Sequence, residues 1–266
     1  MVPRYPQRIV CLTEETTELL YLLGEQERIV GISGFTVRPP QARKEKPKVS
    51  AFTSAKIDRI LALEPDLVLG FSDLQADIAS SLIRSGVAVY ISNQRSVQAI
   101  LDMMLIVGSM VDAKKRVSAL LDQWASRIEA MRRRCSANER RPVVYFEEWD
   151  EPRISGIRWV SELIEIAGGV DCFPERALKP LAKDRIIEKD EEIIRRQPDI
   201  IIGSWCGKKF RPERVRAREG WERTPAVRLD HLYEIKSCDI LQPGPAALTD
   251  GLTQLEVIVN RWRVGK

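Results

Sequence analysis

The sequence predicts an α/β fold built from two related halves, each with a parallel sheet, and three observations lead to this prediction. A segment of the first half recurs in the second, the strand in each copy is apolar on both faces, and an amphipathic helical stretch separates the halves. The length of 266 residues suits two domains of ordinary size. We therefore expect an N-terminal α/β lobe over 1–95, a linking helical backbone over 96–138 and a C-terminal α/β lobe over 139–266.

The internal repeat pairs Asp58–Gly70 with Glu191–Gly203, which begins 133 residues further along the chain. In each copy a short helical stretch ends before a Pro-Asp pair, because proline disfavours helix at the preceding residue. Three apolar residues and a glycine follow, and a strand without polar alternation is typical of a parallel sheet covered by helices on both faces. A second match, of Thr17–Gly24 with Ser161–Gly168, supports a duplication.

Hydrophobic periodicity predicts the remaining elements. Further strands are expected over 9–12, 29–32, 87–91, 143–146 and 232–235, and helices over 15–23, 76–84, 161–166 and 248–262. Between the halves, apolar residues from Ile100 to Met131 recur mostly every three, four or seven positions, which is the pattern of an amphipathic helix. We expect this helix to be interrupted near Gly108, and a helical connection of this kind to join the lobes.

Composition and motifs exclude several classes of protein. No apolar run reaches 18 residues, so no membrane-spanning helix is predicted, and a net charge of +4 gives no indication of nucleic-acid binding. The single histidine, His231, and widely spaced cysteines give no metal cluster, and the chain lacks G-x-S-x-G, P-loop and G-x-G-x-x-G motifs. We therefore expect no catalysis, no bound metal and no required cofactor.

The N-terminal segment lacks the apolar region and cleavage site of an export signal. Two interpretations stay open: a periplasmic protein whose signal has been removed, or a cytoplasmic protein that begins at Met1.

Taken together, these segments resemble the cobalamin-binding branch of the periplasmic substrate-binding proteins of ABC transporters. The resemblance is carried by Arg8–Leu20, Val30–Ser33 and Pro39-Pro40, by Ile57–Gly70, Ser155-Gly156 and Ala167–Gly169, and by Gln197–Asp199 and Gln242–Pro245. It implies two Rossmann-like lobes joined by a long rigid helix, with a ligand in the cleft between the lobes and no nucleic-acid partner.

The resemblance also implies roles for individual residues. Phe35 and Phe71 match ligand contacts of the first lobe, and aromatic rings suit a flat macrocycle. Arg153 stands where relatives often carry an aromatic residue, and Asp239 lies near an acidic contact. Two exposed carboxylates of the family dock onto a membrane permease. Glu191 matches the second of these positions well, and Asp77 matches the first loosely.

Three tryptophans and a loop arginine are further candidates for ligand contact. Trp205 directly follows the repeated strand and precedes Lys208–Arg214, so an aromatic platform with cations beside it is predicted there, with a solvated basic loop as the alternative. Trp149 lies in a charged loop predicted after the strand over 143–146, where the alternative is a core role. For Trp159, at a helix start, a core role is an equal alternative. For Arg38, beside Pro39-Pro40, the alternative to a position facing the cleft is an ordinary loop charge.

These observations and the resemblance predict a non-catalytic, monomeric substrate-binding protein that holds a corrinoid such as cobalamin. Delivery of the ligand to an ABC permease is implied by the resemblance alone. A ferric-siderophore or haem carrier of the same fold is the first alternative, which Arg38, Arg153 and the Lys208–Arg214 cluster favour. An enzyme that acts on a small anionic metabolite is the alternative from another class.

Overall fold

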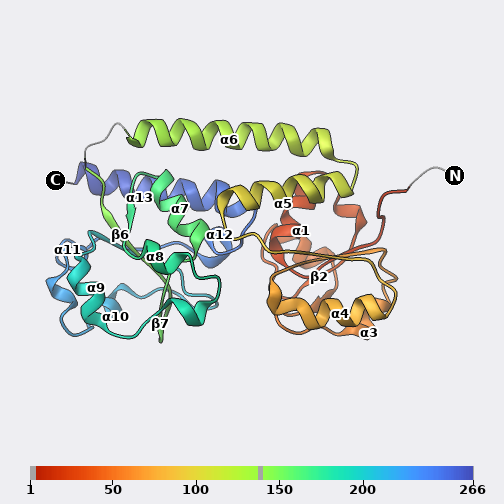
Figure 1. Cartoon of the computed structure of the whole chain (residues 1–266), viewed down its shortest axis with the longest axis horizontal. Helices are drawn as coiled ribbons and strands as arrows, with labels where there is room; N and C mark the ends of the chain where they lie inside the picture. The colour runs from red at the N-terminus through yellow and green to blue at the C-terminus, as the bar shows by residue number, and fades with distance from the viewer. Residues whose placement is uncertain (1–3, 137–139, 266) are drawn as a thin grey trace. The chain divides into compact units, whose positions relative to one another are not determined.

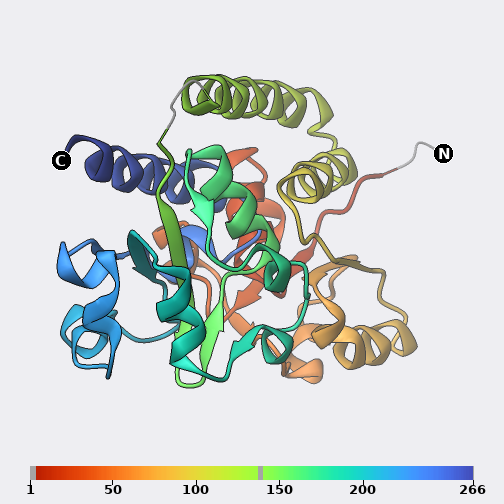
Figure 2. The same ribbon diagram turned by 60° about the vertical axis from the view of Figure 1, so that its left-hand side comes forward.

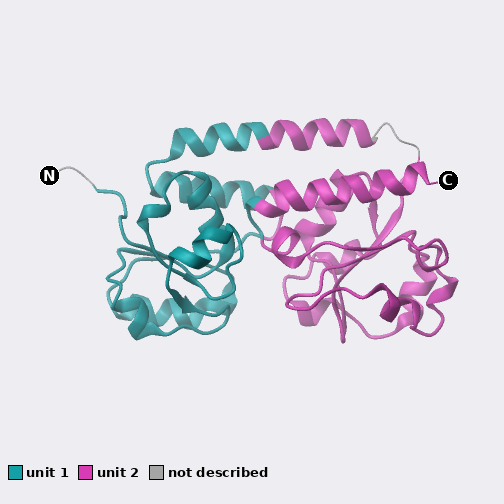
Figure 3. Cartoon of the chain, turned by 180° about the vertical axis from the view of Figure 1, so that it is seen from behind, with its two compact units in different colours: residues 1–94, 98–123, 243–245 teal, residues 95–97, 124–242, 246–266 magenta. Residues whose placement is uncertain are grey.

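Two compact units make up the chain in its computed structural model, which describes residues 4–136 and 140–265. Unit 1 comprises residues 1–94, 98–123 and 243–245, and unit 2 comprises residues 95–97, 124–242 and 246–266 (Figure 3). The units are therefore not continuous in sequence: a short C-terminal segment belongs to unit 1. The predicted domain boundary between residues 138 and 139 lies outside the described residues.

Unit 1 contains a five-stranded, fully parallel sheet in the order β3-β2-β1-β4-β5. On one face, Ile60 of α3 and Ile78 and Leu82 of α4 pack against Val10 and Val68, while α1 and α5 lie on the other side (Figure 1). The elements of this sheet and its helices are β1 (Ile9–Cys11), α1 (Glu14–Leu22), β2 (Ile29–Ser33), α2 (Pro40–Glu45), β3 (Lys48–Ser50), α3 (Ile57–Leu61), β4 (Leu67–Phe71), α4 (Ala76–Arg84), β5 (Val89–Ser92) and α5 (Val97–Met110).

Unit 2 contains a six-stranded sheet in the order β11-β10-β6-β7-β9, with β8 beside β6. The strands are β6 (Val143–Asp150), β7 (Arg153–Ser155), β8 (Val170–Asp171), β9 (Ile186–Ile187), β10 (Ile200–Gly203) and β11 (Leu232–Glu234). The principal helices are α7 (Arg158–Ile166), α8 (Pro174–Ala177), α9 (Asp190–Arg196), α10 (Pro212–Arg216), α11 (Pro225–Arg228), α12 (Ser237–Ile240) and α13 (Leu252–Val264), with a π-helical turn over Ala247–Gly251 before α13.

The α/β class is confirmed, but the second sheet is mixed rather than wholly parallel. Strand β6 runs four residues beyond the predicted end at Phe146 and forms an antiparallel hairpin with β7, which in turn pairs antiparallel with β9 (Figure 2). The prediction of a loop over Glu147–Arg153 was wrong. The charged residues of this segment belong to a strand. Glu147 and Asp150 are buried there and form ion pairs with distant residues, which the sequence alone does not indicate.

The repeated Pro-Asp segments form the same local structure in both units. The residue before each proline, Glu64 or Gln197, has a positive φ. Gln197 is the C-cap of α9, whereas Glu64 lies three residues after the last residue of α3, Leu61. The amide of Asp66 donates to the Arg8 carbonyl, and its carboxylate accepts from the Gln7 and Arg8 amides at 2.7 and 2.9 Å. Asp199 bonds in the same way to the carbonyl and amide of Val143. Each aspartate thus attaches its turn to the start of the central strand of its sheet.

The predicted connection consists of two helices, α5 and α6 (Lys114–Ser136). Helix α5 continues through Gly108 to Met110, so the break falls three residues later than predicted, and Asp112 has a φ of 61° in the turn. Gly108 is needed for another reason: a Cβ there would lie 2.6 Å from Cγ1 of Val117. The glycine therefore allows the start of α6 to pack closely against the end of α5.

Candidate functional site

The candidate site of unit 1 lies at the carboxyl ends of its parallel strands, where ligands of open α/β sheets bind. Phe35, two residues after β2, has 68% of its side chain surface exposed. Phe71 ends β4 and is only 6% exposed, with its ring 6.5 Å from that of Phe52. Of the two aromatic residues expected to contact a ligand here, Phe35 therefore exposes its ring to solvent, whereas the ring of Phe71 is buried next to that of Phe52.

Arg38 bonds to acidic residues of α1. Its Nε lies 2.8 Å from Oε1 of Glu18, and its amide donates to Oε2 of Glu14 at 3.2 Å. Glu14 and Glu15 are 4% and 1% exposed, and burial raises the pKa of each carboxyl to about 7. The first turn of α1, which follows β1, therefore holds two carboxyl groups with pKa values near neutral pH. The sequence analysis did not identify them.

In unit 2, a buried ion pair lies where β6 and β10 end. Glu147 has no exposed surface, and its carboxylate accepts from both terminal nitrogens of Arg218 at 2.7 and 2.8 Å and from Nε1 of Trp205 at 3.0 Å. Trp205 is 3% exposed, and its ring packs edge-on against Phe210, with centroids 5.0 Å apart. Trp205 thus lies in the core of unit 2, as the support of the loop that follows β10.

That loop carries a cluster of cations, Lys208, Lys209, Arg211 and Arg214, which we call the basic cup; these four residues line a cavity of about 280 Å³. Nζ of Lys208 lies 4.4 Å from the ring centroid of Trp149 and 5.1 Å from that of Trp205. Trp149 is half-buried, and its Nε1 donates to the Glu151 carbonyl at 2.8 Å. The structure therefore brings Trp149, Trp205 and the predicted cations together.

Three further candidates have structural partners. Nε of Arg153 lies 2.7 Å from Oδ1 of Asp190, and its guanidinium lies over Trp221. Trp159 is 3% exposed and donates to the Ile240 carbonyl. Asp239 is half-buried and accepts from Nε2 of Gln254 at 3.1 Å. The family resemblance predicted Arg153 and Asp239 as ligand contacts. Their partners, Asp190 and Gln254, could not be predicted from the sequence, because each lies in a different segment of the chain.

The two predicted docking carboxylates are exposed, each near the start of a helix. Asp77 is in the first turn of α4, and Glu191 is in the first turn of α9. Glu191 borders a depression of about 780 Å³ that is also lined by Arg176, Glu188, Lys189, Glu192, Arg195 and Arg223 among others. The surface around Glu191 is thus crowded with charges of both signs.

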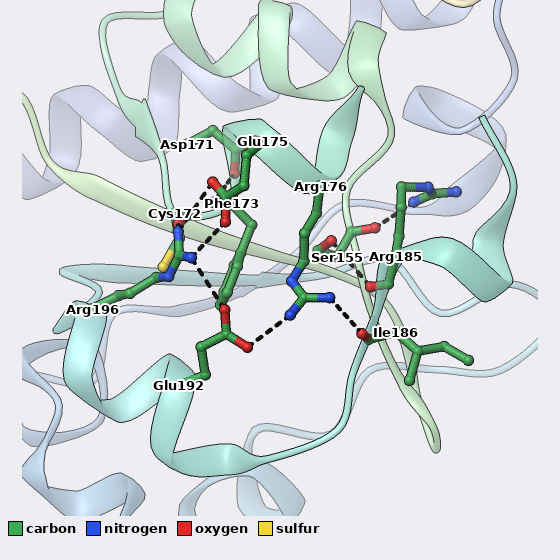
Figure 4. Close-up of polar contacts among 10 residues, drawn as sticks. All are labelled: Ser155, Asp171, Cys172, Phe173, Glu175, Arg176, Arg185, Ile186, Glu192 and Arg196. Carbon is green, nitrogen blue, oxygen red and sulfur yellow. Dashed lines mark hydrogen bonds and ion pairs between the residues drawn. The ribbon is translucent and has the colours of Figure 1, made fainter. Parts of the chain in front are cut away.

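Helix α9 is fixed by an arginine–glutamate network around Phe173 (Figure 4). Arg196 places its guanidinium 4.1 Å from the ring centroid of Phe173 and pairs with Glu175 at 2.5 Å and with Glu192 at 3.1 Å. Arg176 pairs with the other oxygen of Glu192 at 2.8 Å. Because Glu192 adjoins Glu191, the network holds the backbone that presents the predicted docking carboxylate.

Metal ligation has no support among residues 4–136 and 140–265, where no group of three or more His, Cys, Asp or Glu side chains is placed to hold an ion. His231, the only histidine, has Nδ1 3.3 Å from the Tyr233 hydroxyl. Among the described helices, none combines the length and the apolar composition that a membrane-spanning segment requires.

Comparison with known proteins matches residues 9–238 to a family model described as periplasmic binding protein. A vitamin B12-binding protein of Vibrio parahaemolyticus is 26% identical over 251 residues, which cover 91% of this chain and 86% of the relative. Among solved structures, a possible iron-binding periplasmic protein of Staphylococcus epidermidis superposes with a TM-score of 0.81 at 22% identity, covering 96% and 99% of the two chains. The periplasmic heme-binding protein RhuT of Roseiflexus sp. RS-1 superposes with a TM-score of 0.78 at 24% identity, and the match covers 95% of this chain and 99% of RhuT.

Proposed function

Because the chain belongs to the periplasmic binding protein family, as a substrate-binding protein of the ABC-import type, we propose that it captures a corrinoid such as cobalamin for an ABC permease. The role is binding and delivery, without catalysis. The proposal is supported by the vitamin B12-binding relative, which matches over nine-tenths of this chain. A ligand cleft between the two halves stays a prediction.

One structural observation carries the choice of a flat macrocycle: the exposed ring of Phe35 at the carboxyl end of β2. An exposed phenylalanine in a loop at a sheet edge is costly in water, and stacking on a flat, largely apolar ligand would remove that surface from solvent. We propose that Phe35 contacts the ligand directly. Phe71 and Arg38 then act mainly by shaping the loops of unit 1. The other candidates shape the loops of unit 2, namely Trp149, Arg153, Trp159, Trp205 and Asp239.

An anionic iron chelate or haem is the second candidate, and the basic cup favours it. Carboxylate or catecholate groups bind well beside clustered lysine and arginine side chains. The iron-binding and heme-binding proteins of similar fold support this alternative. Affinity for such a ligand should fall steeply as salt rises, because the attraction between partly exposed charges is screened.

Calorimetric titration of cobalamin, cobinamide, haem and a panel of ferric siderophores tests the proposal. We expect micromolar or tighter binding of a corrinoid, and about tenfold weaker binding after Phe35→Ala, which is the usual effect of truncating an aromatic contact. Leu178→Ala is the matched control, since Leu178 is 66% exposed in unit 2. Binding of haem or a siderophore with no corrinoid bound at micromolar concentration would replace the proposed ligand with the second candidate.

A further inference from the structure

We infer that the basic cup is an oxyanion subsite that binds the phosphodiester of a corrinoid's nucleotide tail. The inference rests on the proposed corrinoid ligand and deepens it, because it assigns one chemical group of the ligand to one loop of unit 2. Four cations line the cavity, and none of the described residues that line it is acidic. A concave surface of one sign of charge concentrates ligands of the opposite sign.

The charge of the cup is only partly neutralised by the protein. Asp150, which is 5% exposed, pairs with Lys208 and, at 3.3 Å, with Arg214. In the segments that the structure describes, the side chains of Lys209 and Arg211 have no ion-pair or hydrogen-bond partner, and both are exposed. One carboxylate therefore pairs with two of the four cations, and the positive charge that remains can be balanced by an anionic ligand.

Two of the cations are held in place before any ligand arrives. Asp150 and the faces of Trp149 and Trp205 fix the ammonium of Lys208, and the guanidinium of Arg214 lies 5.9 Å from the Trp205 ring centroid. Such cation–π contacts restrain a long side chain without neutralising its charge. Preorganised cations cost less entropy on binding than mobile ones, so Lys208 and Arg214 define the site, and Lys209 and Arg211 close on the anion.

The loop itself is anchored so that the cup has a fixed shape. Phe210, 2% exposed, covers the end of β10 so closely that a Cβ on Gly203 would lie 1.9 Å from its ring. The amide of Phe210 donates to Glu234 at 2.9 Å, and Gly207 adopts a φ of 77° in the intervening turn. The chain between these anchors carries Lys208 and Lys209, so neither cation belongs to a freely moving segment.

The chemistry of the cup suits a phosphate ester better than a neutral group. The planar guanidinium of arginine binds two phosphate oxygens at once, and lysine supplies a compact point charge. Cobalamin carries a phosphodiester between its corrin ring and its nucleotide base, whereas cobinamide lacks the phosphate and the base. The cup therefore predicts that this protein distinguishes the two corrinoids through Lys209 and Arg211.

The test compares cobalamin with cobinamide in calorimetric titrations of the full chain and of the double variant Lys209→Ala/Arg211→Ala. We expect the variant to bind cobalamin about ten- to a hundredfold more weakly, since two charge-assisted hydrogen bonds are lost, and to bind cobinamide as the unmodified protein does. The dependence of cobalamin affinity on NaCl should also become shallower in the variant. The control Lys179→Ala/Lys183→Ala removes the same charge from exposed positions of unit 2 and should leave both affinities unchanged.

Each outcome decides one of the two claims. Equal weakening for cobalamin and cobinamide, or no weakening for either, overturns the phosphate subsite while leaving the corrinoid proposal standing. If neither corrinoid binds to the unmodified protein, the proposed function fails, and inorganic pyrophosphate then tests the cup alone. Millimolar binding of pyrophosphate that the double variant loses supports an oxyanion site, and equal binding by both proteins refutes it.

Discussion

Arg218 donates two hydrogen bonds to the carboxylate of Glu147, at 2.7 and 2.8 Å. Glu147 lies in unit 2 and has no surface exposed to solvent. Residue 218 is 71 positions from its partner along the chain. The pair also fixes Trp205, whose Nε1 donates to the same carboxylate at 3.0 Å. The buried pair therefore supports both the core of unit 2 and the loop that carries the basic cup.

Replacing Arg218 by methionine should destabilise the protein strongly, because it leaves the Glu147 carboxylate buried without a counter-charge. We expect the free energy of unfolding to fall by about 3–5 kcal/mol in urea titrations. The double variant Glu147→Gln/Arg218→Met should recover part of this loss. As the control, Arg216→Ala breaks an exposed pair with Asp230, which should change stability by less than about 1 kcal/mol. Equal stability of R218M and R216A would contradict a role for burial.

Stability should decrease as pH rises from about 4.5 to 7, in part because of Glu15. Burial raises the pKa of Glu15 from 4.5 to about 7, so across this range the folded chain keeps a proton that the unfolded chain releases. Glu15→Gln removes this titration and keeps an acceptor for the Thr13 hydroxyl, which donates at 2.6 Å. As the pH rises from 4.5 to 8, we expect the free energy of unfolding of the variant to increase by about 1–3 kcal/mol relative to that of the original protein. Urea titrations of both proteins, with exposed Glu188→Gln as the control, measure the difference, and parallel pH profiles would contradict the assignment.

Gly203→Ala should disturb the loop after β10 through a direct clash with Phe210. The added Cβ would lie 1.9 Å from Cδ2 of that ring, so the ring has to move out of its packed position. Overpacking of this kind costs about 1–3 kcal/mol. Pairing the change with Phe210→Leu should restore part of the stability in thermal or urea unfolding. No recovery in the double variant would show that the ring is not the obstacle.

Glu191→Ala should impair delivery of the ligand without impairing its capture. Glu191 is exposed on α9, and the Phe173 network holds its backbone through Glu192 and Arg196. We expect an unchanged dissociation constant for the ligand. Uptake of labelled cobalamin by cells that produce the variant with its permease should fall at least tenfold, since losing one partner of a buried interfacial charge pair costs about 2–5 kcal/mol. Asp184→Ala, also exposed on unit 2, is the control. A matching loss in ligand affinity would place Glu191 in the binding site instead.

Much of the fold could be predicted from local patterns. Helix α4 begins and ends at the residues expected from periodicity, Ala76 and Arg84. Both Pro-Asp segments form the predicted helix, turn and buried strand. Strand β6 could not be delimited, because hydrophobic alternation fails where Glu147 and Asp150 are buried by ion pairs from distant residues.

The sequence by itself determined the two α/β halves, their repeated Pro-Asp turns and the cluster of cations after β10. These features depend on residues within one helix or strand, where the chemical period and the backbone preference act together. Only the tertiary structure decided that Trp205 is buried while Phe35 is exposed, and that Asp150 leaves two of four cations unpaired. Exposure and charge balance are set by residues far apart in the chain, and no local pattern records which of them meet.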